Sequence, residues 1–308
     1  GRFVIDNYHF FGWVNGLLVI LFSFICIAGT WQYIPKLASR TTQTSSKMLH
    51  DIFIIFRNKN FFYIVIVDLA VGGASCITAT LLMVTYTYFW QLDATQTSLL
   101  FAGPILLAVL ISAVFSRSLN RLFEKQQILR LTCALTSINL IWLTPLKLFD
   151  LLPDNSTVVF ALICVNWAIH MTMTILRVIT VHSLLADIVD EQELATGKRQ
   201  EGVVFAVAFF SSKFMGAFGY VIVGPFLDLI GLQAGAQPGE VSSTVMWGLG
   251  LLMGPGLAII MLLPIWMSFK LNMSHASHLE VRQALSESEW AAESNDSTPV
   301  SKRKSRWV

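Results

Sequence analysis

Seven long apolar runs, separated by short charged stretches, constrain this chain more than any other feature. Each run has about 18 residues or more, which is the length an α-helix needs to cross the hydrocarbon core of a bilayer. Only 13% of the 308 residues are charged, whereas soluble domains carry about 25%. The sequence therefore predicts an all-α membrane protein with seven transmembrane helices, over residues 10–34, 61–90, 98–115, 128–148, 158–185, 203–232 and 245–269.

Lysine and arginine gather on one side of these predicted spans. The other side has only Arg2 and Lys147. Because basic loops stay in the cytoplasm, this asymmetry predicts a multi-pass protein of the cell (inner) membrane with a cytoplasmic carboxyl terminus. The basic residues on the cytoplasmic side are Lys36, Arg40, Lys47, Arg57, Lys59, Arg117, Arg121, Lys125, Arg130, Lys198, Arg199, Lys270, Arg282, Lys302, Arg303, Lys304 and Arg306.

The remaining composition excludes several kinds of site. The net charge is +2, and the basic residues follow membrane topology, so we expect no nucleic-acid partner. The cysteines occur one each in four separate runs, at Cys26, Cys76, Cys133 and Cys164. Their spacing fits neither a disulfide framework nor a metal site, and we expect them to pack as small apolar residues.

Lys213 is a lysine within the sixth apolar run. At about 1.5 Å per residue it lies on the order of 15 Å from the start of its helix, near the middle of the bilayer. A charge at that depth costs roughly 2.5 to 3.5 kcal/mol on insertion scales, which makes it a candidate functional residue. We expect Lys213 to pair with carboxylates and to compete with or replace a coupling cation. The alternative is a fixed ion pair between two helices.

Two further charges lie inside predicted spans. Asp68 is on the second run and Arg177 on the fifth. They are candidates for a substrate cavity, where they would bind hydroxyl or carboxylate groups. Alternatively, the two side chains pair with each other across packed helices.

The densest group of charges follows the fifth run. Asp187, Asp190 and Glu191 are three and four residues apart, so they share one face if the helix continues past the membrane. With Arg199 they could form charge-assisted bonds that close a cytoplasmic gate and release on opening. The alternative is a solvated turn, since exposed ion pairs contribute little.

The same segment resembles a known family. The runs ADIVDEQELATGKRQEG (186–202) and FFSSKFMGAFG (209–219) look like the charged loop and penultimate helix of the glycoside–pentoside–hexuronide:cation symporters. These symporters are the melibiose-carrier group of the major facilitator superfamily. The opening of the second run at Asn58 and Asn60 and the basic turn at Arg117 and Arg121 are also similar. On this resemblance, the seven spans correspond to the last seven of twelve helices.

The resemblance implies a sugar or glycoside symporter, not an enzyme, driven by sodium or protons, with no other cofactor and no resident metal. It implies a role in cation coupling for Lys213 and a cytoplasmic gate made of Asp187, Asp190, Glu193, Arg199 and Glu201. The partners are then the lipid bilayer and an amino-terminal half that this sequence lacks. The implied divisions are the last helix of that half (1–34), a central loop (35–60), a six-helix bundle (61–269) and a flexible cytoplasmic tail (270–308).

Other functional classes fit the same pattern of spans. A related fold could carry a lipid or another amphiphile by symport. A seven-helix receptor-like protein, or a membrane protein that transports nothing, would also have these runs. Lys213 lies on the sixth run rather than the last, which argues against a retinal pigment with a Schiff base at that lysine.

Overall fold

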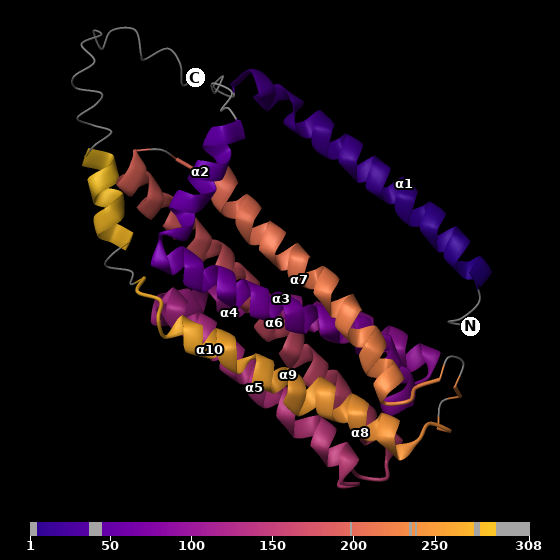
Figure 1. Cartoon of the computed structure of the whole chain (residues 1–308). Coiled ribbons are helices and arrows are strands. Elements are labelled where there is room, and N and C mark those ends of the chain that lie inside the picture. Colours follow the sequence, from indigo (N-terminus) through magenta and orange to yellow (C-terminus); the bar gives the residue numbers. More distant parts are fainter. Residues whose placement is uncertain are drawn as a thin grey trace, which may run out of the picture. The chain divides into compact units, whose positions relative to one another are not determined.

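The structure is a computed structural model that describes residues 5–36, 45–197, 199–233, 236–237, 239–273 and 278–287. Within these ranges every regular element is a helix (Figure 1). Seven helices are long and apolar enough to cross a membrane. The predicted all-α architecture with seven membrane-spanning helices is therefore confirmed. The chain forms two compact units, Gly1–Met48 and Leu49–Val308.

The first unit consists mainly of α1 (Ile5–Thr30), followed by the 3₁₀ turn η1 (Trp31–Lys36). The side chains described from His9 to Tyr33 are all exposed within the chain. Most of them are apolar, so lipid or another protein surface must cover them in a membrane. Helix α2 (Ser45–Phe56) crosses the boundary between the two units.

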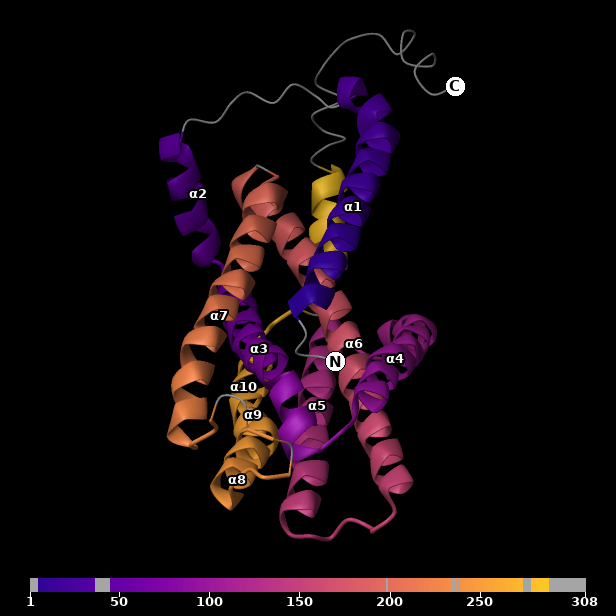
Figure 2. The ribbon, with the colours of Figure 1, turned by 90° about the vertical axis from the view of Figure 1, so that its right-hand side faces the viewer.

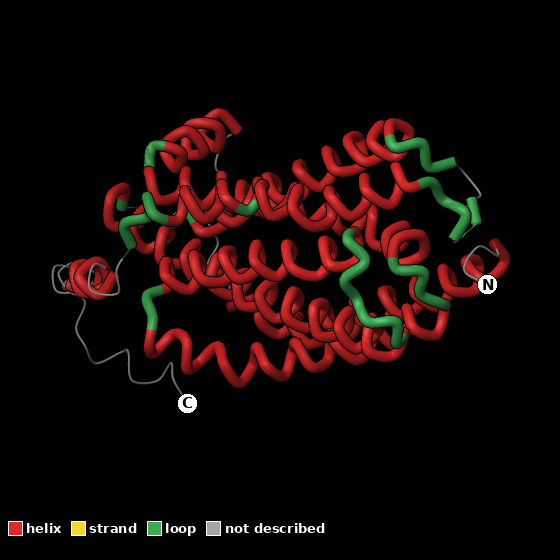
Figure 3. Tube along the Cα trace, turned by 90° about the horizontal axis from the view of Figure 1, so that it is seen from below, coloured by secondary structure: helices red, strands yellow, loops and turns green. Residues whose placement is uncertain are grey.

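The second unit is a bundle of long helices with loops at their two ends (Figure 3). Helices α3, α5 and α7 begin at one end of the bundle, and α6 ends there. We name this end the charged end. The elements after α2 are α3 (Lys59–Val84), η2 (Thr85–Phe89), α4 (Ala94–Leu122), α5 (Lys125–Leu148), α6 (Ser156–Thr196), α7 (Glu201–Leu229), α8 (Ser243–Leu251), η3 (Leu252–Gly256), α9 (Leu257–Ile260) and α10 (Leu262–Ser268). Residues 278–287 form a further helix.

Short polar side chains fix where several of these helices begin. The side chain of Asn58 accepts hydrogen bonds from the backbone N–H groups of Asn60 and Phe61 at the start of α3. Asp93 and Gln96 form a reciprocal capping box at the start of α4. These bonds satisfy N–H groups that have no partner within the helix.

Two apolar cores hold the bundle together. One lies toward the charged end and includes Phe61, Leu129 and Ile188. The other lies toward the opposite end and includes Phe89, Leu143 and Leu249. Among the long helices, α6 packs against both α4 and α5, and α3 packs against α7 (Figure 2).

Small residues allow α3 and α7 to approach closely. A Cβ atom at Gly219 would overlap the Sγ atom of Cys76 on α3. One turn earlier, the Cys76 thiol donates to the carbonyl oxygen of Gly216, with 2.6 Å between Sγ and O. Backbones that approach this closely gain dispersion contacts, which drive helix association where no hydrophobic effect operates.

Two helices contain π-helical turns. The turn η3 includes Gly254, Pro255 and Gly256. A Cβ at Gly254 would overlap the hydroxyl of Thr144, so α5 and η3 pack backbone against side chain there. The turn η2 ends the third helix and contributes Thr85 and Tyr86 to the interior.

We predict different effects for two alanine substitutions on α7. Gly219→Ala forces a shift at Cys76 and should lower stability by about 1 to 3 kcal/mol, the usual range for overpacking. Gly216→Ala is the matched control, because no atom of a neighbouring residue lies within 4 Å of the place that its Cβ would take. Thermal unfolding of the two purified variants in detergent measures the difference. Equal unfolding temperatures would contradict the prediction that a side chain at position 219 overlaps Cys76 on α3.

Candidate functional site

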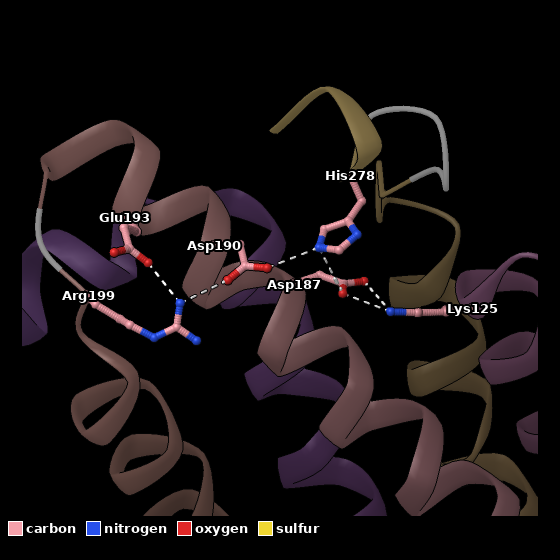
Figure 4. A network of polar contacts seen from close by, with 6 residues as sticks. All are labelled: Lys125, Asp187, Asp190, Glu193, Arg199 and His278. Carbon is pink, nitrogen blue, oxygen red and sulfur yellow. Dashed lines mark hydrogen bonds and ion pairs between the residues drawn. The ribbon is translucent and has the colours of Figure 1, made fainter. Parts of the chain in front are cut away.

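A cluster of alternating charges lies at the charged end of the bundle (Figure 4). Helix α6 continues well past the predicted apolar run, to Thr196, so its acidic residues lie on a helix rather than in a turn. Asp187, Asp190 and Glu193 follow one another at intervals of three residues and share a face. We define the charge cluster as Lys125, Asp187, Asp190, Glu193, Arg199, Glu201 and His278.

One ion pair of the charge cluster joins α5 to α6. The Nζ atom of Lys125 lies 2.8 Å and 2.6 Å from the two carboxylate oxygens of Asp187. The Asp187 side chain is only 10% exposed. A carboxylate this buried needs a cation, because desolvation of an unpaired charge costs several kcal/mol.

His278 joins the segment after α10 to the same helix. Its Nε2 atom lies 3.3 Å from Asp187 Oδ1 and 3.3 Å from Asp190 Oδ2. One imidazole therefore bridges two carboxylates that are one turn apart. The sequence predicts a flexible tail from residue 270; residues 278–287 of it are helical, and residues 288–308 lie outside the described part of the chain.

Arg199 reaches the cluster because the chain reverses at the end of α6. Gly197 has a φ of 67°, a left-handed conformation that favours glycine, and its N–H bonds to the carbonyl oxygen of Glu193. Arg199 Nη1 then lies 2.9 Å from Glu193 Oε2 and 3.4 Å from Asp190 Oδ1. Its Nε lies 3.4 Å from Glu201 Oε2 at the start of α7.

The hydrogen bond with Glu193 is the main cause that raises the pKa of Arg199 above its ordinary value. The nearby charges of Glu193 and Asp190 act in the same direction. The guanidinium is therefore a permanent cation. The five residues of the predicted gate come together in one network, with Lys125 and His278 as two further members that local sequence spacing does not reveal.

A polar tie beside the cluster connects α3 to α6. Asn58 Nδ2 donates to Glu191 Oε2 at 3.2 Å, and Asn60 Nδ2 donates to the same oxygen at 3.4 Å. The Asn60 side-chain oxygen also accepts from the N–H of Asn272, after α10. Five segments of the bundle thus meet through polar contacts at the charged end: α3, α5, α6, the start of α7 and the segment after α10.

A cavity of about 120 Å³ lies between α3, α6 and α7, and we name it the polar cavity for the few charged and polar side chains in its otherwise apolar lining. Asp68 and Arg177 both line it, together with His182, Phe209 and Ser212. Within the described structure no ion pair shorter than 4.0 Å joins Asp68 to Arg177, so the alternative of a direct pair is not observed. A carboxylate of α3 and a guanidinium of α6 therefore line the same cavity.

Arg177 is held by hydroxyl groups instead of a carboxylate. The residue is 3% exposed. It donates from Nη1 to Thr136 Oγ1 at 3.2 Å and from Nη2 to Thr174 Oγ1 at 3.3 Å. Its Nε atom is buried without a hydrogen-bond partner among the described residues. This guanidinium keeps donor capacity beyond its two threonine bonds.

Lys213 follows Ser212, which lines the polar cavity, but its own side chain is exposed on α7. Among the described residues it has no carboxylate within 4.0 Å. The fixed ion pair considered from the sequence is thus not observed within this part of the chain. The described residues also contain no group of three or more histidine, cysteine, aspartate or glutamate side chains placed to hold a metal ion.

Comparison with protein families decides the class. A family model described as MFS/sugar transport protein matches residues 5–273. The chain belongs to this family. The transporter is therefore a multi-pass membrane protein of the major facilitator superfamily, as the resemblance implied, while its place in the melibiose-carrier group stays a prediction. A comparison with curated proteins finds no match for the chain.

We predict that Lys125 and Asp187 are energetically coupled in the transporter. The two single variants Lys125→Met and Asp187→Asn should each lower the free energy of unfolding. The sum of these two losses should exceed the loss in the double variant by a coupling energy of about 0.5 to 3 kcal/mol. The matched control is the pair of Arg199 and Glu201, whose side chains are 45% and 57% exposed. Exposed pairs contribute at most about 1 kcal/mol.

Thermal unfolding of the purified variants in lipid nanodiscs measures both cycles. Additive effects at Lys125 and Asp187 would contradict the role of this pair in joining α5 to α6.

Proposed function

We propose that the transporter carries a sugar or glycoside together with sodium ions or protons, by alternating access. The family description, which names sugar transport, supports the substrate class. The observation that carries the proposal is the polar cavity, which Asp68 of α3 and Arg177 of α6 both line within the membrane-spanning helices. Hydroxyl groups of a sugar both donate and accept, and this pair supplies one acceptor and one donor.

In this proposal the charge cluster acts as the cytoplasmic gate. Its bonds lie at the end of α6, and the same helix carries Arg177 in the cavity wall. Movement of α6 during opening would therefore break contacts at the gate and, at the same time, change the shape of the cavity. Such paired changes couple substrate binding to conformational state, because a ligand shifts an equilibrium only by its differential affinity for the two states.

Lys213 takes the role of a coupling residue in this proposal. Its side chain is exposed on α7. We expect it to meet carboxylates of an amino-terminal half, as the resemblance implies, and we expect the bilayer to cover the remaining apolar surface. The protein then lies in the cell membrane with its carboxyl terminus in the cytoplasm. Transport requires no cofactor beyond the coupling ion.

Uptake by the full-length protein in liposomes tests both roles. Asp68→Asn should lower uptake of a transported sugar at least tenfold, since loss of a charged hydrogen-bond partner costs about 1.5 to 3 kcal/mol. Asp228→Asn is the matched control, because Asp228 lies near the far end of α7, away from the residues that line the cavity. Lys213→Ala should change the dependence of uptake on sodium or proton gradients.

The outcomes separate the two claims. Wild-type uptake in Asp68→Asn would contradict the cavity as the substrate site. An unchanged cation dependence in Lys213→Ala would contradict the coupling role while leaving the cavity untouched. If the wild-type protein took up no sugar under any gradient but took up a lipid, the proposed substrate class would be wrong.

A further inference from the structure

His182 is a titratable residue of the polar cavity to which sugar binding by Asp68 and Arg177 gives no role. It lies on α6, between Arg177 and Asp187, at about 7.5 Å from each along the helix axis. Of the described residues that line the cavity, only Asp68, Arg177 and His182 carry or can take up a charge. The cavity therefore brings a carboxylate of α3 together with a guanidinium and an imidazole of α6.

The hydrogen bond of His182 fixes which of its ring nitrogens is free. Its Nδ1 atom lies 2.8 Å from the carbonyl oxygen of Val178, one turn earlier on α6. Because a carbonyl oxygen only accepts, Nδ1 must carry the hydrogen. The Nε2 atom of the neutral ring then has an unshared electron pair. Among the described residues Nε2 has no hydrogen-bond partner, so this pair is available to a proton.

Asp68 contributes a carboxylate without a fixed partner to the same space. Among the described residues it makes no hydrogen bond and no ion pair within 4.0 Å. Neither its oxygens nor His182 Nε2 is fully buried, so water in the cavity can reach both groups. His182 and Arg177 both interact electrostatically with this carboxylate. A positive charge on His182 would therefore have a counter-charge across the cavity.

Two phenylalanine rings of α7 also favour a positive charge on His182. The imidazole lies nearly parallel to the Phe205 ring, with an interplanar angle of 9° and centroids 6.3 Å apart. The centroid of Phe209, which lines the cavity, is 5.5 Å from that of the imidazole. The negative face of an aromatic ring attracts a cation at distances up to about 6 Å. The site thus stabilises an imidazolium without a fixed ion pair.

The lining suits a proton better than a metal cation. Hard metal cations take about six to eight oxygen ligands. Among the described lining residues, only Asp68 and Ser212 have side-chain oxygens, and the guanidinium of Arg177 repels a metal ion. A proton needs a single acceptor with an unshared electron pair, and His182 Nε2 supplies one.

We propose that His182 Nε2 binds the proton that the transporter couples to its substrate, with Asp68 as the counter-charge. The proton adds from water to the unshared pair of Nε2 and later returns from the same atom to water. While it is bound, Nε2 donates to a substrate hydroxyl, and that hydroxyl donates to Asp68. Loss of the proton removes the donor, so substrate affinity depends on protonation. This inference rests on the proposed sugar transport and assigns its coupling ion.

Nitrogen NMR of the full-length protein in nanodiscs, with isotope-labelled histidine, tests the proton site in the absence of substrate. The signals that disappear in His182→Gln identify the two nitrogens of His182. As the pH is lowered, Nε2 should gain a hydrogen while Nδ1 keeps its own. An Nε2 atom that stays without hydrogen at every pH at which the protein is folded would overturn the proposal.

Accumulation of radiolabelled melibiose and glucose in proteoliposomes tests the coupling. A glutamine at position 182 keeps an N–H donor but cannot take up a proton. His182→Gln should therefore exchange sugar across the membrane like the wild type, while its accumulation under an inward proton gradient falls to the level reached without a gradient. His170→Gln is the matched control, because His170 lies on the same helix but lines a second cavity, where it stacks on Trp167. It should keep the wild-type response to the gradient.

The outcomes separate this inference from the proposed function. A wild-type response to the proton gradient in His182→Gln would overturn the inference. Accumulation by the wild-type protein under a sodium gradient but not under a proton gradient would also overturn it, and sugar transport would stand. Absence of sugar uptake under every gradient would contradict the proposed function itself, and the histidine titration would still decide whether Nε2 binds a proton.

Discussion

The ion pair between Lys125 and Asp187 is the contact on which the charged end of the bundle depends. The Asp187 carboxylate is largely buried beside α5, and no arrangement of α5 and α6 that separates it from a cation would be stable. His278 and Arg199 extend this pair into a chain of polar contacts along α6. The pair of Arg199 and Glu201 at the far end is the most exposed and therefore contributes least to stability. The stabilising effect of these contacts thus decreases from Lys125 toward Glu201.

Helix α6 connects this cluster to the two cavities of the bundle. Trp167, Arg177 and Asp187 lie on it at steps of ten residues, and each step is about 15 Å along the axis. Each step also turns the side chain by about 80° around the helix. As a result, the three residues face different neighbours: a second cavity of about 60 Å³ that Trp167 lines, the polar cavity and the charge cluster. A helix that carries all three sites transmits any displacement among them.

Sequence alone predicts the features that depend on local pattern. The spans follow from apolar length, and the shared face of Asp187 and Asp190 follows from helical periodicity. The contacts of Lys125 and His278 were not predictable, because they join segments far apart in the chain, and the basic turn near Lys125 suggested only topology. For Asp68 and Arg177 the sequence left two possibilities open: a shared substrate cavity or an ion pair with each other. In the structure Arg177 instead donates hydrogen bonds to Thr136 and Thr174.

Hydrogen–deuterium exchange of the full-length protein, compared with its Asp187→Asn variant, tests the central claim most directly. If the charge cluster fixes the end of α6, amides in residues 188–196 and in the helix 278–287 should exchange faster in the variant, while amides in 160–176 stay unchanged. Glu201→Gln, at the exposed end of the chain of charges, should leave all three regions as in the wild type. Unchanged exchange at 188–196 and 278–287 in Asp187→Asn would contradict the account.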